Sequence, residues 1–153
     1  MQAFVFPSAI CATISSAAFR LKLLTGATHN RAVLDLSPFQ NLALRGGFLL
    51  VEVRLTAQPL LDPIERAATA QTVIHGHHFH IYLRADLDER ELSVSLYHEV
   101  LEAATVAAER PPDAVLELNE WHFEQAAQAA HQRLGLASPR TLNLLLADFG
   151  FPA

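Results

Sequence analysis

The sequence predicts an α+β protein in which a small antiparallel sheet packs against a buried helix and further C-terminal helices. Two observations predict this class. Strand patterns gather in residues 48–84 and helix patterns fill residues 86–150, so strands and helices do not alternate. The length of 153 residues and the 51% of hydrophobic residues fit one compact domain spanning 1–153 and exclude intrinsic disorder.

Residues 1–47 are expected to form an N-terminal extension made of a strand and a helix. Met1–Phe19 carries no charge, but several polar residues interrupt it. Arg20 and Lys22 follow this apolar stretch, whereas the basic residues of a secretory signal precede it. We therefore expect no membrane span, and interpret the segment as a buried strand followed by a helix that ends near Leu24.

Charge is divided unevenly along the chain. Residues 1–47 carry four basic residues against one acidic residue, whereas residues 48–153 carry seven arginines against fifteen acidic residues. An acidic body without a basic cluster argues against direct binding of nucleic acid, and a single lysine leaves no polybasic patch for a membrane. The lone Cys11 excludes an internal disulfide and suits the cytoplasm, so any metal site has to use histidine and carboxylates.

Three expected helices share one local signal, a side chain that can cap the helix followed by proline at the first helical position. The pairs are Ser37-Pro38, Asp62-Pro63 and Ser138-Pro139. Glycines predict that the first of these helices ends at Gly46-Gly47 and the third near Gly150.

Two stretches alternate between apolar and polar residues, as half-buried strands do. In residues 48–55 the alternation predicts an inward face made of Leu49, Val51, Val53 and Leu55. In residues 79–83 it predicts an inward face made of Phe79, Ile81 and Leu83. Gly76 follows a β-branched run, so residues 72–84 are expected to form a hairpin.

Two longer helices are expected after the sheet. The first is capped by Asp86 or Asp88 and runs to about Glu109, where Pro111-Pro112 ends it. The second spans residues 113–134 and ends at Gly135. Its inward stripe is predicted to consist of Leu116, Glu120, Phe123, Ala127, Ala130 and Leu134.

Leu92–Ala108 is apolar on nearly every side and is therefore expected to be buried, yet it contains His98, Glu99 and Glu102. Buried carboxylates need partners, because an uncompensated charge is costly in the interior. His98 and Glu102 are one turn apart on the same helix face, a spacing at which both can bind one metal ion. Glu99 is rotated by about 100° from His98, which suits a general base beside that ion.

Glu120 is the candidate third metal ligand, because it is a carboxylate in the otherwise apolar stripe of the following helix. Its rivals are Glu124, one turn further on, and His122, which should point away from the stripe. Roles without a metal ion stay open for both helices. The ionisable residues of the first helix could form a solvated face or pair with Arg84 or Arg110, and Glu120 could serve only the helix dipole.

Four histidines crowd the predicted hairpin, namely His75, His77, His78 and His80. Strand alternation puts His78 and His80 on the outward face, where two of the four could meet a second metal ion. An exposed polar turn is the alternative interpretation.

The stretch HIYLRADLDERELSVSLYHEVLEA resembles the core of the minimal zincin metallopeptidases, in particular the ImmA/IrrE-type group and related short phage and bacterial proteins. In that family a strand and a capped loop lead into a helix with an HExxH motif, and a third ligand follows on a later helix. The resemblance covers roughly residues 70–135. It implies His98 as the first ligand, Glu99 as the base that activates water and Glu120 as the acidic third ligand. Glu102 stands where the family has its second histidine.

The resemblance implies a metal-dependent hydrolase, specifically a peptidase whose peptide substrate lies along the sheet edge near residues 78–84. Zn²⁺ is the expected ion, and a set of one histidine and two carboxylates also admits Mn²⁺ or Fe²⁺. Because HExxE is less specific than HExxH, a catalytically weak module that regulates a partner protein is the alternative. Either function implies a peptide or protein partner in the cytoplasm, and homodimer formation stays open.

Overall fold

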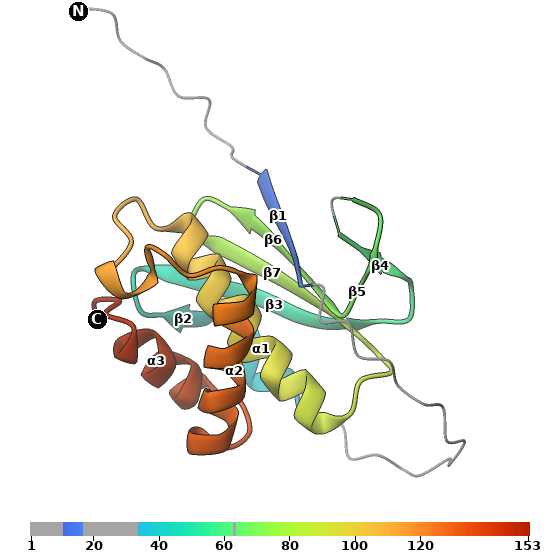
Figure 1. Cartoon of the computed structure of the whole chain (residues 1–153). Coiled ribbons are helices and arrows are strands. Elements are labelled where there is room, and N and C mark those ends of the chain that lie inside the picture. Colours follow the sequence, from blue (N-terminus) through green and yellow to red (C-terminus); the bar gives the residue numbers. More distant parts are fainter. Residues whose placement is uncertain (1–10, 17–33, 63) are drawn as a thin grey trace, which may run out of the picture.

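The computed structural model describes residues 11–16, 34–62 and 64–153, which form an α+β fold (Figure 1). The predicted fold class is therefore confirmed. A five-stranded sheet has the order β1-β6-β7-β3-β2, a two-stranded ribbon pairs β4 with β5, and the helices gather on one face of the large sheet. The strands are β1 (Cys11–Ser16), β2 (Leu42–Leu44), β3 (Phe48–Thr56), β4 (Leu60–Leu61), β5 (Ala67–Ala68), β6 (Ala70–His75) and β7 (His78–Arg84).

The large sheet is mixed rather than antiparallel throughout. β3 runs parallel to β7, whereas the pairs β1–β6, β6–β7 and β2–β3 are antiparallel. The prediction of a wholly antiparallel sheet is wrong for the pair β3–β7. The chain returns along β6 to the end of the sheet at which β3 begins, so β7 runs in the same direction as β3. β7 consequently lies inside the sheet, between β6 and β3, and does not offer the free edge expected near residues 78–84.

β3 changes its buried face halfway along the strand. Phe48 and Leu50 are buried before an irregularity of the register between Leu50 and Glu52, and Val53 is buried after it. A β-bulge of this kind adds one residue and so reverses the alternation of inward and outward side chains. Of the inward residues predicted for this strand only Val53 is fully buried, and Leu55 is 36% exposed.

The predicted hairpin is confirmed. β6 and β7 pair antiparallel across a turn in which Gly76 adopts a φ of 60°, and the inward residues Phe79, Ile81 and Leu83 are fully buried. β1 pairs with β6 and provides the strand expected in the N-terminal segment. The helix expected to end near Leu24 lies outside the described residues.

The α-helices of the described residues are α1 (Glu89–Ala107), α2 (Glu120–Leu134) and α3 (Pro139–Asp148). α1 and α3 begin at predicted caps, Asp88 and Ser138, and each cap forms a reciprocal capping box. No helix within the described residues is long and apolar enough to cross a membrane.

Two of the helices expected from a cap and a proline do not form. The chain makes a single 3-10 turn, Ser37–Phe39, because it reverses at Asn41 (φ 51°) and enters β2. At Asp62 the side-chain carboxylate accepts the N–H groups of Ile64 and Arg66 at 3.0 and 2.8 Å. These bonds close a turn between β4 and β5, so the capping side chain serves a loop instead of a helix.

The helix expected from residue 113 begins later, at Glu120. Asp113–Val115 is a short 3-10 turn, and Asn119 caps α2. Leu116 of the predicted inward stripe therefore lies outside the helix and is 60% exposed. Among the other members of the predicted stripe, Phe123, Ala127 and Ala130 are buried, as predicted, whereas Leu134 is only partly buried and Glu120 is exposed.

Two side chains of α1 hold the end of α2 in place. The buried Ser93 Oγ accepts the N–H of Ala137 at 2.8 Å and lies 2.9 Å from His131 Nδ1. The Tyr97 hydroxyl donates to the carbonyl of Gly135 at 3.0 Å. These contacts fix α2, together with the carboxylates that it carries, against α1.

Ser93→Ala should destabilise the protein by about 1–3 kcal/mol, because the buried N–H of Ala137 loses its acceptor. Urea denaturation followed by circular dichroism measures the change in the free energy of unfolding. Ser95→Ala, a half-buried position on the same helix, is the matched control and should change stability less. Equal stabilities of the two variants would contradict this role of Ser93.

Candidate metal centre

α1 lies between the sheet and α2, and a histidine and a glutamate are buried on its mostly apolar surface. His98 is 1% exposed and Glu99 is 0% exposed. The alternative that these residues form a solvated helix face is therefore wrong. The two side chains point to different neighbours, His98 toward α2 and Glu99 toward β6.

Three carboxylates converge on the His98 ring. Its Nε2 atom lies 3.2 Å from Glu102 Oε2 and 3.2 Å from Glu120 Oε1. Its Nδ1 atom lies 3.1 Å from Glu124 Oε2. Because Glu120 and Glu124 are one turn apart on α2, that helix reaches both nitrogens of a single ring.

Glu99 is held against the sheet by one oxygen only. The Thr72 hydroxyl of β6 donates to Glu99 Oε2 at 2.6 Å. The other oxygen, Oε1, is the one buried side-chain N or O atom of the described residues that has no hydrogen-bond partner. A buried carboxylate oxygen without a donor is costly, so this atom marks a place where a further group would be stabilising.

Without a metal ion, these surroundings shift the pKa of both residues. Burial alone would lower the pKa of His98, but hydrogen bonds to Glu102, Glu120 and Glu124 outweigh it and raise the pKa to about 12. Burial raises the pKa of Glu99 to about 8, against the opposing effects of the His98 charge and the Thr72 hydroxyl. The metal-free centre is therefore an imidazolium ion among carboxylates, with Glu99 protonated at neutral pH.

The residues present fit a divalent metal ion. One ligand atom from each of His98, Glu99 and Glu102 lies within 4.8 Å of the others, the one such group within the part of the chain that the structure describes. Two donors that bind one ion at about 2.1 Å are separated by about 3.0–3.4 Å at octahedral or tetrahedral angles. The separations of Glu102 and Glu120 from His98 Nε2 are of this size. Glu99, one of whose oxygens has no hydrogen-bond partner, belongs to this group of three residues.

The geometry separates the candidate third ligands. Glu120 approaches the same ring nitrogen as Glu102, whereas Glu124 approaches the opposite nitrogen, where it can orient the ring by accepting the Nδ1–H. His122 does not join the cluster, because its Nδ1 accepts the N–H of Asn119 at 3.2 Å.

One partner of the centre was missed by our sequence reasoning. Thr72 occupies an inward position of β6, between buried Ala70 and Ile74, and a hydroxyl in such a position is a signal that could have been noticed. The ion pair considered between Arg84 and the α1 residues is not found, because Arg84 pairs with Asp86 instead.

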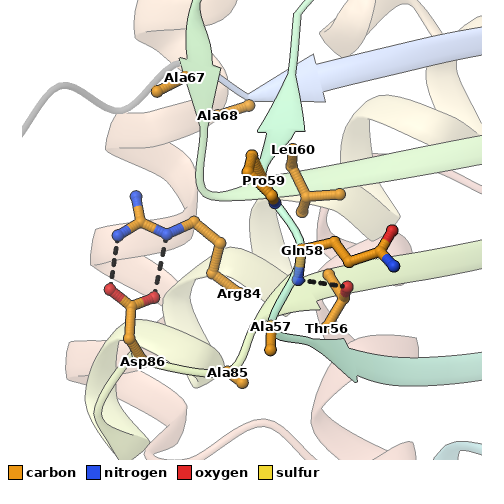
Figure 2. Close-up of a pocket in the computed structure, with 10 residues that line it drawn as sticks. All are labelled: Thr56, Ala57, Gln58, Pro59, Leu60, Ala67, Ala68, Arg84, Ala85 and Asp86. Carbon is orange, nitrogen blue, oxygen red and sulfur yellow. Dashed lines mark hydrogen bonds and ion pairs between the residues drawn. The ribbon is translucent and has the colours of Figure 1, made fainter.

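A hollow of about 680 Å³ lies apart from this centre, between the β4–β5 ribbon and the junction of β7 with α1 (Figure 2). Arg84 and Asp86 face each other at its wall, with N–O distances of 2.9 and 2.5 Å. None of the candidate metal ligands lines this hollow, so the hollow is not part of the candidate metal centre.

No protein-family model matches the chain, and neither a curated protein nor a solved structure matches it significantly. These comparisons assign no family. The resemblance to the zincin peptidases therefore depends on the motif and on the arrangement of the α1 residues alone.

Glu99→Gln should stabilise the metal-free protein at alkaline pH relative to the wild type. The folded-state pKa of about 8 lies above the ordinary value of 4.5, so the folded wild type binds an extra proton between these values and loses stability as the pH rises through them. Glutamine cannot ionise and removes this loss. We expect the stability difference, variant minus wild type, to grow by at least about 1 kcal/mol between about pH 5 and about pH 9.

Urea denaturation in the presence of a chelator measures this difference at each pH. A difference that stays constant across the range would contradict the raised pKa of Glu99.

Proposed function

We propose that this protein is a metal-dependent hydrolase, specifically a small peptidase of zincin-like type. The observation that carries the proposal is the convergence of carboxylates from two helices on one buried imidazole, beside a buried carboxylate oxygen that has no partner. In this proposal His98 Nε2, Glu102 and Glu120 are the metal ligands. Glu124 holds the ring in the tautomer that leaves Nε2 free to bind the ion.

A divalent ion, when bound, supplies Lewis-acid chemistry that acidifies water and polarises a carbonyl group. The positive charge of that ion would favour the ionised form of Glu99, which acts as the general base. Its Oε1 accepts a proton from the attacking water, whose oxygen adds to the peptide carbonyl carbon. Glu99 then returns this proton to the leaving amine as the C–N bond breaks. Thr72 holds the other carboxylate oxygen and so fixes the direction in which Oε1 points.

The donor set favours Zn²⁺, with Mn²⁺ or Fe²⁺ as other occupants. Glu102 replaces a histidine of the zincin pattern, so the set contains one nitrogen and two carboxylates and is harder than a two-histidine set. A second negative ligand also makes bound water less acidic. We therefore expect the protein to bind a divalent metal ion but to hydrolyse peptides slowly.

An extended peptide would add to the outer edge of β1 in this proposal. β7 is enclosed by its neighbours, whereas β1 is an outermost strand of the sheet that the described residues form, and it contacts α1, the helix that carries His98. Free strand edges offer backbone donors and acceptors to an extended chain.

A second candidate function is a binding module that regulates a partner protein and hydrolyses little or nothing. It is favoured by Trp121, which directly follows Glu120 and is 64% exposed, and by Leu116, which precedes α2 and is 60% exposed. Large exposed apolar side chains are typical of surfaces that contact other proteins. Glu102→His separates the two functions, because a gain of peptidase activity would show that the scaffold supports catalysis.

Removal of Glu102 or Glu120 should weaken metal binding at least about tenfold, because each contributes a negative oxygen ligand. The change is measured by isothermal titration of chelator-treated protein with Zn²⁺, comparing Glu102→Gln and Glu120→Gln with the wild type. Glu117→Gln, which removes an exposed carboxylate just before α2, is the matched control and should bind as the wild type does. Equal affinities of all four proteins would contradict the ligand assignment.

Glu99→Gln should keep the metal and lose hydrolysis by at least about 100-fold, because general-base catalysis of this kind contributes that much. Hydrolysis is measured on a mixed fluorogenic peptide library, with metal content determined on the same samples. Retention of full activity would exclude Glu99 as the base. Loss of the metal itself would assign Glu99 to the ligand set instead.

A further inference from the structure

Three histidines lie at the outward positions of β6 and β7, which alternate with the buried positions of these two strands. His75 of β6 and His78 of β7 are directly opposite each other in the antiparallel register, so their side chains leave the same face. His80 lies two residues beyond His78 and therefore points the same way. The rings of His75 and His80 are in edge contact, with centroids 5.7 Å apart.

His80 is already oriented by a carboxylate. Its Nδ1 atom lies 3.1 Å from Glu52 Oε1 on the neighbouring strand β3. Glu52 is itself held by Arg54 Nε, at 2.5 Å from its Oε2, and by the Tyr82 hydroxyl, at 3.3 Å from its Oε1. A histidine that donates one N–H to a fixed carboxylate presents its other nitrogen as a metal ligand, which is the usual arrangement in metal sites.

We propose that His75, His78 and His80 form a second metal site, which binds a divalent first-row transition ion such as Zn²⁺ through three imidazole nitrogens. Imidazole is the preferred neutral ligand of such ions, and three of them leave a coordination position open to solvent. This site shares no residue with the His98 centre and does not depend on the function proposed for that centre.

The second site closes by rotation of side chains. The ring nitrogens of His75, His78 and His80 are further apart than the ligand atoms of His98, Glu99 and Glu102. His75 and His78 are exposed at the end of the hairpin and can turn toward His80, whose ring Glu52 holds in place. The bound ion then links β6 to β7 across the Gly76 turn.

His77 provides a matched control within the same turn. Its ring is in edge contact with Phe48 at 5.3 Å and lines a separate hollow with Arg110 and Phe151. It is adjacent in sequence to the proposed ligands, but its ring is already packed elsewhere.

Titration of the full chain with Zn²⁺ tests the proposal, with calorimetry for stoichiometry and ¹H–¹⁵N spectra of the imidazole nitrogens for assignment. We expect Zn²⁺ to shift the ring signals of His75, His78 and His80. We expect His78→Gln and His80→Gln each to weaken this binding at least about tenfold, whereas His77→Gln leaves it unchanged.

The outcomes separate this proposal from the one for the His98 centre. Binding that is lost in His78→Gln but retained in Glu120→Gln supports the hairpin site, whether or not the His98 centre also binds. Binding that His78→Gln and His80→Gln leave unchanged overturns the hairpin site. Binding that His77→Gln weakens as much as His78→Gln also overturns it, since the effect would then belong to the turn as a whole.

Discussion

The burial of an imidazole among carboxylates is the constraint on which the rest of this structure depends. A ring that is 1% exposed tolerates a charge only if partners from other elements reach it. The partners of His98 come from α1 and α2, so the two helices must keep one register for both ring nitrogens to stay paired. Ser93 and Tyr97 secure this register through their bonds at the end of α2.

Two adjacent residues of α1 connect the centre to two layers of the fold. His98 faces α2, and Glu99 lies against Thr72 in the sheet. The same geometry can therefore serve two states, an imidazolium ion held by carboxylates or a neutral ring that shares a metal ion with them. Because the pKa of His98 is raised to about 12 when no metal is bound, a metal ion has to displace a proton from Nε2, and binding should release protons to solvent.

Much of the helical half could be predicted from the sequence, because its signals are local. The cap at Asp88, the apolar pattern of α1 and the exceptional carboxylate Glu120 are all visible within a few turns of chain.

The remaining features of the site and of the sheet depend on how elements that are distant in sequence pack together. The place of Glu124 beside Nδ1 follows from the way α2 packs on α1, and the bond from Thr72 joins residues 27 apart in the chain. The parallel pairing of β3 with β7 and the bulge in β3 likewise follow from tertiary pairing, which the strand alternation alone does not encode.

Anomalous scattering from crystals grown with zinc tests the central claim most directly, because it locates the ion without reference to any activity. We predict a peak at the zinc absorption edge about 2.0–2.2 Å from both His98 Nε2 and an oxygen of Glu102. Glu124 should still be bonded to Nδ1 in those crystals. Zinc bound elsewhere on the chain, with His98 Nε2 still in contact with the oxygens of Glu102 and Glu120 and no peak between them, would contradict the claim.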